Sequence, residues 1–191
     1  FDEDKNIYTI DSDGLIVSIN SQTGNKNWSQ KLNLDITSGI TSYNNIIFFG
    51  TSRGMLYAFD IENLKDSDDY LGINNIPFIS DSLPVTPKWH HQLKSEVISP
   101  VVGSYKNIFV KTSDGNMLSL DVDEGTLDWK NIGRNIPLSI RGSGSAAVDY
   151  ENIYLARDDG TLISLLQESG KLNWYVSISA KSGRNELESL R

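Results

Sequence analysis

The sequence predicts an all-β fold, a β-propeller in which about four blades are present. The first observation is a unit of two short apolar runs around a Gly-containing turn, which occurs four times along the 191 residues. The second is the tryptophan that follows each unit. The third is the interval of 40 and then 45 residues between the last three tryptophans, Trp89, Trp129 and Trp174. Intervals of roughly 40–45 residues with about four strands each are typical of propeller blades.

The hairpin of each unit is predicted by its turn. The four paired runs occupy residues 5–20, 44–60, 106–121 and 151–166, and their turns end in Gly14, Gly54, Gly115 and Gly160. Three of these turns carry Asp-Gly, which is a strong hairpin signal because both residues tolerate positive φ. We therefore expect two antiparallel strands in each unit.

An outer strand carrying the tryptophan is expected to follow each hairpin. In three units a glycine stands four residues before the tryptophan, and these pairs are Gly24 with Trp28, Gly125 with Trp129, and Gly170 with Trp174. The remaining unit reaches Trp89 only after residues 61–88, which contain an acidic run and three prolines. We expect this insertion to be a loosely packed surface loop.

An inner strand of small residues is expected before each of the last three hairpins. These strands lie near Ser38, Ser99 and Gly144, where small side chains suit a crowded central axis. The hairpin strands alternate in a way that makes both faces apolar. In residues 54–60, Leu56, Ala58 and Asp60 share one face, and Met55, Tyr57 and Phe59 share the other. Such a sheet suits a position between two neighbouring blades.

The repeats divide the chain at roughly residues 1–35, 36–95, 96–135 and 136–179, with 180–191 as a linker toward a further blade. The first repeat lacks an inner strand, which leaves about fifteen strands. We therefore expect a partial β-propeller. Because an open propeller exposes sheet faces and an edge, self-association of the open fragment is a second expectation.

Composition excludes several classes of function. There are 25 acidic and 17 basic side chains, and the net charge of −8 argues against binding to nucleic acid, which needs clustered Lys and Arg. The chain contains no cysteine, so a disulfide, a thiolate nucleophile and a cysteine metal site are impossible. No apolar stretch of about 18 residues is present to span a bilayer.

Candidate metal and catalytic motifs are weak. His90 and His91 are neighbours on an expected strand, so their side chains point to opposite faces and do not easily chelate one ion. The run Asp66–Asp69 begins like a calcium loop, but Leu71 stands where that loop requires glycine. We expect no metal site, no catalytic residue and no enzyme activity.

The segments INSQTGNKNW, LDVDEGTLDW and LLQESGKLNW resemble the repeat of PQQ-type propellers. The resemblance implies an architectural role, between adjacent blades, for the repeat residues, which are Gly24, Trp28, Trp89, Gly125, Trp129, Gly170 and Trp174. It also raises two alternatives, a PQQ-dependent quinoprotein dehydrogenase and the sensing ectodomain of a larger receptor. The absence of a cysteine pair and of an inner-strand Asp, Glu or Asn cluster argues against the quinoprotein, so we expect no cofactor.

A narrower resemblance is carried by Leu138-Ser139-Ile140-Arg141-Gly142, by the segment 160–174 and by the tail 178–191. These resemble the central blades of the BamB family, eight-bladed lipoprotein scaffolds of the outer-membrane β-barrel assembly machinery. The resemblance implies a place on the periplasmic face of a Gram-negative outer membrane, through a lipid anchor that this chain lacks. It also implies that the chain binds the POTRA region of BamA.

By residue matching, the implied contact residues are Leu138, Ile140 and Arg141. The connection that carries them joins an outer strand to the next inner strand, and it is expected at the same face of the disc as the mid-blade turns. The insertion 61–88 is expected at the opposite face. On spacing alone, the favoured interpretation is that Leu138 and Ile140 start the next inner strand, and the resemblance to the family reverses that preference.

Overall fold

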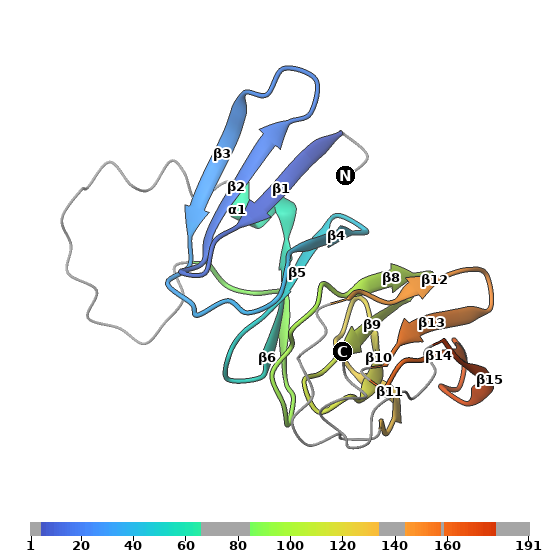
Figure 1. Ribbon diagram of the computed structural model, residues 1–191. Coiled ribbons are helices and arrows are strands. Elements are labelled where there is room, and N and C mark those ends of the chain that lie inside the picture. The colour runs from blue at the N-terminus through green and yellow to red at the C-terminus, as the bar shows by residue number, and fades with distance from the viewer. Residues whose placement is uncertain (1–4, 66–84, 134–143, 158, 179–191) are drawn as a thin grey trace, which may run out of the picture.

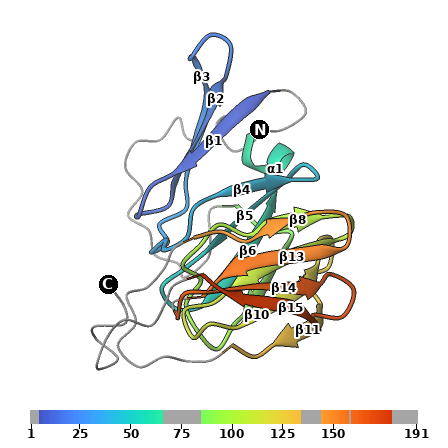
Figure 2. The same ribbon diagram turned by 45° about the vertical axis from the view of Figure 1, so that its right-hand side comes forward.

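A computed structural model describes residues 5–65, 85–133, 144–157 and 159–178. Within these ranges the chain folds into fifteen strands and one short helix, α1 (Ile61–Lys65). The strands form four antiparallel sheets, each made from consecutive strands, and we call these sheets blades 1 to 4. Figures 1 and 2 show the blades following one another in chain order along an arc. The predicted all-β class is confirmed.

Blade 1 has three strands and the other blades have four. Blade 1 contains β1 (Asn6–Ile10), β2 (Leu15–Asn20) and β3 (Lys26–Lys31); blade 2 contains β4 (Thr41–Tyr43), β5 (Ile46–Gly50), β6 (Met55–Asp60) and β7 (Trp89–Gln92). Blade 3 contains β8 (Val102–Ser104), β9 (Asn107–Lys111), β10 (Met117–Asp121) and β11 (Leu127–Asn131); blade 4 contains β12 (Ala147–Val148), β13 (Asn152–Ala156), β14 (Thr161–Leu166) and β15 (Leu172–Ser177). The innermost strands are the shortest.

The tryptophan of each outer strand lies directly opposite a small residue of its own blade. Ser18, Ser119 and Ser164 pair with Trp28, Trp129 and Trp174, and in all three blades the register shifts at the next residue. In blade 2 the partner of Trp89 is Ala58. All four small residues are fully buried. Because directly opposed side chains share one face of a sheet, a small partner leaves room for the indole ring.

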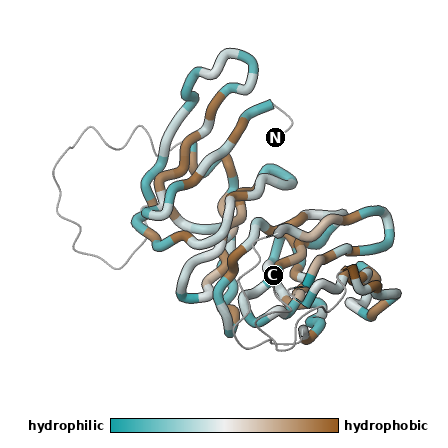
Figure 3. Tube along the Cα trace, in the orientation of Figure 1, coloured by the Kyte–Doolittle hydropathy of each residue, from teal (hydrophilic) through white to brown (hydrophobic). Residues whose placement is uncertain are grey.

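Both faces of the central sheets are buried. In β5, Ile46 and Phe48 contribute to a core shared with blade 3, and Ile47 and Phe49 contribute to a core shared with blade 1. In β6 the same alternation sends Leu56 and Ala58 toward blade 3 and Phe59 toward blade 1. Figure 3 shows the apolar residues concentrated along the strands. The period of two therefore places successive side chains in different interfaces between blades.

The start of the insertion differs from the loosely packed loop expected from the sequence. Residues 61–65 form α1, and its Ile61 and Leu64 are fully buried in the core between blades 1 and 2. Residues 66–84 lie outside the described residues. No helix within the described ranges is long and apolar enough to cross a membrane.

Hydroxyl groups join the inner edge of blade 2 to blade 3. Thr37 Oγ1 donates to the carbonyl oxygen of Val97 at 2.9 Å, and Thr41 Oγ1 donates to that of Val101 at 2.8 Å. Tyr43 Oη donates to the carbonyl oxygen of Tyr105 at 3.0 Å, and the Tyr43 ring lies against Gly103. These contacts satisfy carbonyl groups of one inner strand by side chains of another.

We predict that Thr41→Val lowers the free energy of unfolding by about 0.5–1.5 kcal/mol, the usual net value of one hydrogen bond, because the Val101 carbonyl loses its donor. Thr9→Val on β1 is the matched control, since Thr9 is exposed. The control is expected to change stability by less than about 0.5 kcal/mol. Urea denaturation of both variants measures the difference. Equal effects would contradict a structural role for the Thr41 hydroxyl.

Candidate functional site

The expected partner-binding residues Leu138, Ile140 and Arg141 belong to residues 134–143, which lie outside the described residues. The structure does describe the chain on both sides of them. β11 ends at Asn131, which pairs with Met117 beside the turn of Gly115. β12 begins at Ala147 and runs antiparallel to β13, which leads into the turn of Gly160. Both points therefore lie at the end of the sheets that carries the mid-blade turns.

The chain leaves blade 3 in close contact with the turn of Gly115. The backbone N–H of Gly133 donates to Asn116 Oδ1 at 3.1 Å. A Cβ atom at Gly133 would lie 1.9 Å from the carbonyl oxygen of Gly115. Because no side chain fits at that distance, the close approach requires glycine at position 133.

A hydrogen-bonded carboxylate holds this turn in place. Asp114 accepts hydrogen bonds from Thr112 Oγ1 at 2.5 Å and from Asn116 Nδ2 at 2.6 Å. Burial acts to raise the pKa of Asp114, but hydrogen bonds from Thr112, Ser95 and the Asn116 backbone, with the charge of Lys130, leave it below its ordinary value. The ionised form therefore stabilises the turn that Gly133 contacts.

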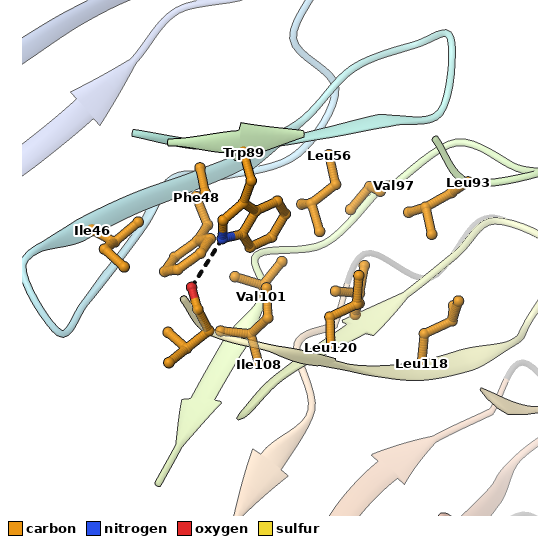
Figure 4. Close-up of a cluster of buried hydrophobic side chains, with 13 residues drawn as sticks. Ile46, Phe48, Leu56, Trp89, Leu93, Val97, Val101, Ile108, Leu118 and Leu120 are labelled. Carbon is orange, nitrogen blue, oxygen red and sulfur yellow. Dashed lines mark hydrogen bonds between the residues drawn. The ribbon is translucent and has the colours of Figure 1, made fainter. Parts of the chain in front are cut away.

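The junctions from blade 2 to blade 3 and from blade 3 to blade 4 use the same contact. Trp89 Nε1 donates to the carbonyl oxygen of Val122 at 3.0 Å (Figure 4), and Trp129 Nε1 donates to that of Gln167 at 2.7 Å. A Cβ atom at Gly125 would lie 2.5 Å from the Trp89 ring, and one at Gly170 would lie 2.3 Å from the Trp129 ring. The tryptophan of one blade thus lies against the turn glycine of the next.

A second side chain extends each of these junctions. His91 Nδ1 lies 3.0 Å from the carbonyl oxygen of Gly125, and Asn131 Nδ2 donates to that of Gly170 at 2.8 Å. Because a carbonyl oxygen can only accept, His91 carries its hydrogen on Nδ1. His90 lies on the other face, and the centroid of its ring is 6.0 Å from the centroid of the Tyr57 ring. Among the described residues, no group of three or more His, Asp or Glu is placed to hold a metal ion.

The first and last tryptophans have different surroundings. Trp28 packs in the core that contains Ile61 and Leu64 of α1, so the helix lies where the next two junctions have a glycine turn. Gly24 has no atom within 4 Å of the position where its Cβ would lie. Trp174 is 41% exposed, and its ring contacts that of Tyr154 on its own blade.

An ion-paired lysine between blades 2 and 3 was not anticipated from the sequence. Lys88 Nζ lies 3.3 Å from Asp60 Oδ1 on its own blade and 3.2 Å from Asp123 Oδ1 on the next. Lys88 directly precedes Trp89 and ends the insertion. The sequence shows that Lys88 stands beside the repeat tryptophan. It does not show the ion pairs, because Asp123 comes close to Lys88 only when two blades pack together.

Comparison with known proteins identifies relatives of the chain. A sequence model of the family described as outer membrane protein assembly factor BamB matches residues 86–191. The outer membrane protein assembly factor BamB of Burkholderia pseudomallei is 21% identical over 135 residues, which are 71% of this chain and 30% of that protein. That of Nitrosomonas eutropha is 23% identical over 135 residues, which are 71% of this chain and 28% of that protein. The chain thus spans less than a third of these relatives.

Solved structures confirm the propeller fold. The crystal structure of BamB from Moraxella catarrhalis matches with a TM-score of 0.77 and 19% identity, over 97% of this chain and 50% of that one. A computationally designed protein, Ika8, matches with a TM-score of 0.65 and 16% identity, over 94% of this chain and 48% of the design. At these identities the likeness concerns the fold.

We predict that Gly125→Ala destabilises the protein more than Gly24→Ala. Both glycines have positive φ, +68° and +71°, so both substitutions carry the same backbone strain of about 1–2 kcal/mol. The methyl group at position 125 also meets the Trp89 ring, which adds about 1–3 kcal/mol of overpacking. Chemical denaturation measures both variants. Equal losses would show that the contact with Trp89 is not tight.

We predict that Asp114→Asn lowers stability in a pH-dependent way. The folded pKa of Asp114 is depressed, so its contribution is complete above the ordinary pKa of Asp, about 3.9, and is lost as pH falls through the folded value. The difference in unfolding free energy between wild type and variant is therefore largest near neutral pH and disappears in acid. Asp13→Asn, at the same position of the blade 1 turn, is the control. A difference that is independent of pH would contradict this account.

Proposed function

We propose that this chain, which belongs to the family of the outer membrane protein assembly factor BamB, acts as a non-catalytic scaffold. It would act in the machinery that inserts β-barrel proteins into the outer membrane. The observation that carries the proposal is the family match over residues 86–191, which includes blades 3 and 4 and the connection between them. Since a fold does not specify a function, the proposal depends on the residues of that connection.

The proposed partner is the POTRA region of BamA, and the proposed contact residues are Leu138, Ile140 and Arg141. Two apolar side chains beside an arginine combine buried area with a directed charge, and arginine is enriched among the residues that dominate protein interfaces.

The framework around the connection supports this proposal. Gly133 is held against the turn of Gly115, and Asn131 is bonded to the Gly170 turn of blade 4. A connection that leaves from fixed points loses less conformational entropy when it binds a partner. The stacked blades then serve to present the connection.

The proposed location is the periplasmic face of a Gram-negative outer membrane, with a lipid anchor elsewhere in the longer protein. The chain covers 30% and 28% of the two BamB proteins from Burkholderia and Nitrosomonas, so most of the sequence of such a whole protein lies outside this chain.

We predict that Arg141→Glu in the full-length protein weakens binding to the purified POTRA domains of the matching BamA by about tenfold or more, as expected when a charge at the centre of an interface is reversed. The control is Arg53→Glu, which makes the same change of charge on an exposed side chain in the mid-blade turn of blade 2. Calorimetric titration measures both affinities. Unchanged affinity in Arg141→Glu, or an equal loss in both variants, would contradict the proposed contact.

A further inference from the structure

A groove separates blades 3 and 4 at the end of the sheets opposite to Asn131 and Ala147. It has a volume of about 630 Å³. Trp129, which hydrogen-bonds to Gln167, is one of the residues that line it. Its walls include two tyrosines, a leucine and three carboxylates, which are Tyr105, Tyr150, Leu166, Asp128, Glu151 and Glu168. We call this feature the blade 3–4 groove.

Two exposed tyrosines form its inner part. Tyr105 and Tyr150 each stand ten residues before the turn glycine of their blade, Gly115 or Gly160, so they occupy the same position in successive repeats. They are 56% and 79% exposed, and their rings meet edge to face with centroids 5.6 Å apart. Tyrosines of this kind offer an apolar ring and a polar hydroxyl, a combination enriched at protein interfaces.

The Tyr105 backbone adds to this observation. Its φ of 52° lies in the left-handed region, which a bulky side chain rarely adopts. The conformation is held by the hydrogen bond that its carbonyl oxygen accepts from Tyr43. The ring is therefore displayed at the groove from a fixed point.

The groove is acidic. Lys106 is the one cationic side chain among its described lining residues, against the three carboxylates of Asp128, Glu151 and Glu168. Asp128 accepts a hydrogen bond from Asn107 Nδ2. None of the described lining residues forms an ion pair with Asp128, in contrast to the junction between blades 2 and 3, where Lys88 is ion-paired.

The preceding junction shows what a cation does at this position. Lys88 comes immediately before Trp89 and lies between Asp60 and Asp123. Burial acts to lower the pKa of Lys88, but its hydrogen bonds and the charges of Asp123 and Asp60 raise it above its ordinary value. The position therefore favours a positive charge.

At the next junction the repeat substitutes a carboxylate for that lysine. Asp128 comes immediately before Trp129, and Glu168 stands two residues before Gly170, as Asp123 stands two residues before Gly125. The following blade thus supplies an acidic residue at both junctions, Asp123 or Glu168, but aspartate stands at the second junction where lysine stands at the first. Two carboxylates flank this groove where one junction earlier a lysine joins the blades.

We propose that the blade 3–4 groove binds an extended basic segment of a partner protein. A lysine or arginine of that segment lies between Asp128 and Glu168 and supplies the positive charge that Lys88 supplies in the preceding junction, and a neighbouring apolar side chain packs on Tyr105 and Tyr150. The charge complementarity and the aromatic wall select a cationic segment with apolar residues beside its charges.

This surface is independent of the proposed POTRA contact. The turns that carry Tyr105 and Tyr150 lie between the first and second strands of their blades, whereas β11 ends and β12 begins at the opposite ends of the sheets. The described ends of the chain that flank residues 134–143 therefore lie at the other end of the sheets from this groove, and we expect the two contacts to be independent.

The test uses the full-length protein and a fluorescein-labelled peptide in which arginine alternates with tyrosine. Fluorescence anisotropy is expected to show binding that weakens with added salt, and about tenfold or more loss of affinity in Glu168→Lys. Tyr150→Ser is expected to weaken binding as well, by removing the aromatic wall. Asp13→Lys, a charge reversal in the exposed turn of blade 1, is the matched control and is expected to bind within about twofold of wild type.

A charge-swapped peptide makes the test independent of the folding of the variant. A peptide with glutamate in place of arginine is expected to bind Glu168→Lys better than it binds wild type, because the reversed site now attracts it. Equal binding of both peptides by wild type, or equal affinities in Glu168→Lys and Asp13→Lys, would overturn the proposal. Arg141→Glu is expected to leave peptide binding unchanged, which separates this surface from the proposed POTRA contact.

Discussion

The structure depends on the burial of apolar side chains on both faces of its sheets. Ile46 and Phe48 leave β5 on one side, and Ile47 and Phe49 leave it on the other, and all four are almost completely buried. An isolated sheet of this kind would expose both of its apolar faces to water, so each blade is stable only beside its neighbours. The tryptophan junctions then set how closely neighbours approach, since Trp89 and Trp129 lie against glycines that admit no side chain.

This constraint separates architecture from binding. Residues that face a neighbouring blade are restricted in size and polarity, whereas the exposed residues of the turns at the two ends of the sheets are not. Variation in one repeat can therefore create a surface without altering the framework. The exchange of Lys88 for Asp128 at equivalent positions keeps the tryptophan contact and changes an ion-paired junction into an acidic groove. The Trp129 contact joins blades 3 and 4, which line this groove.

Much of the fold could be predicted from sequence because the repeat is local. The Asp-Gly turns and the alternation in β6 involve residues close along the chain, and the repeat of Gly with Trp identifies the blade. The helix α1 was missed because Ile61 and Leu64 are buried in a core that also contains Trp28, a residue of another blade. The ion pairs of Lys88 and the contact of Tyr43 with Gly103 were missed for the same reason, since each joins two blades. The groove was missed likewise, because Asp128 and Glu168 belong to different blades and line one groove only when those blades pack side by side. Leu138, Ile140 and Arg141 stay a prediction, carried by resemblance to the family.

The tryptophan junctions hold the blades together, and hydrogen exchange of the Trp89 indole N–H in the full-length protein, followed by NMR, measures whether they do. That hydrogen is bonded to the Val122 carbonyl of the next blade and is released only when blades 2 and 3 separate. We expect it to exchange as slowly as the backbone amides of β5 and β9, which lie on the two sides of this interface. Rapid exchange of the indole while those amides remain protected would show that the blades stay together without the junction, and would contradict the account.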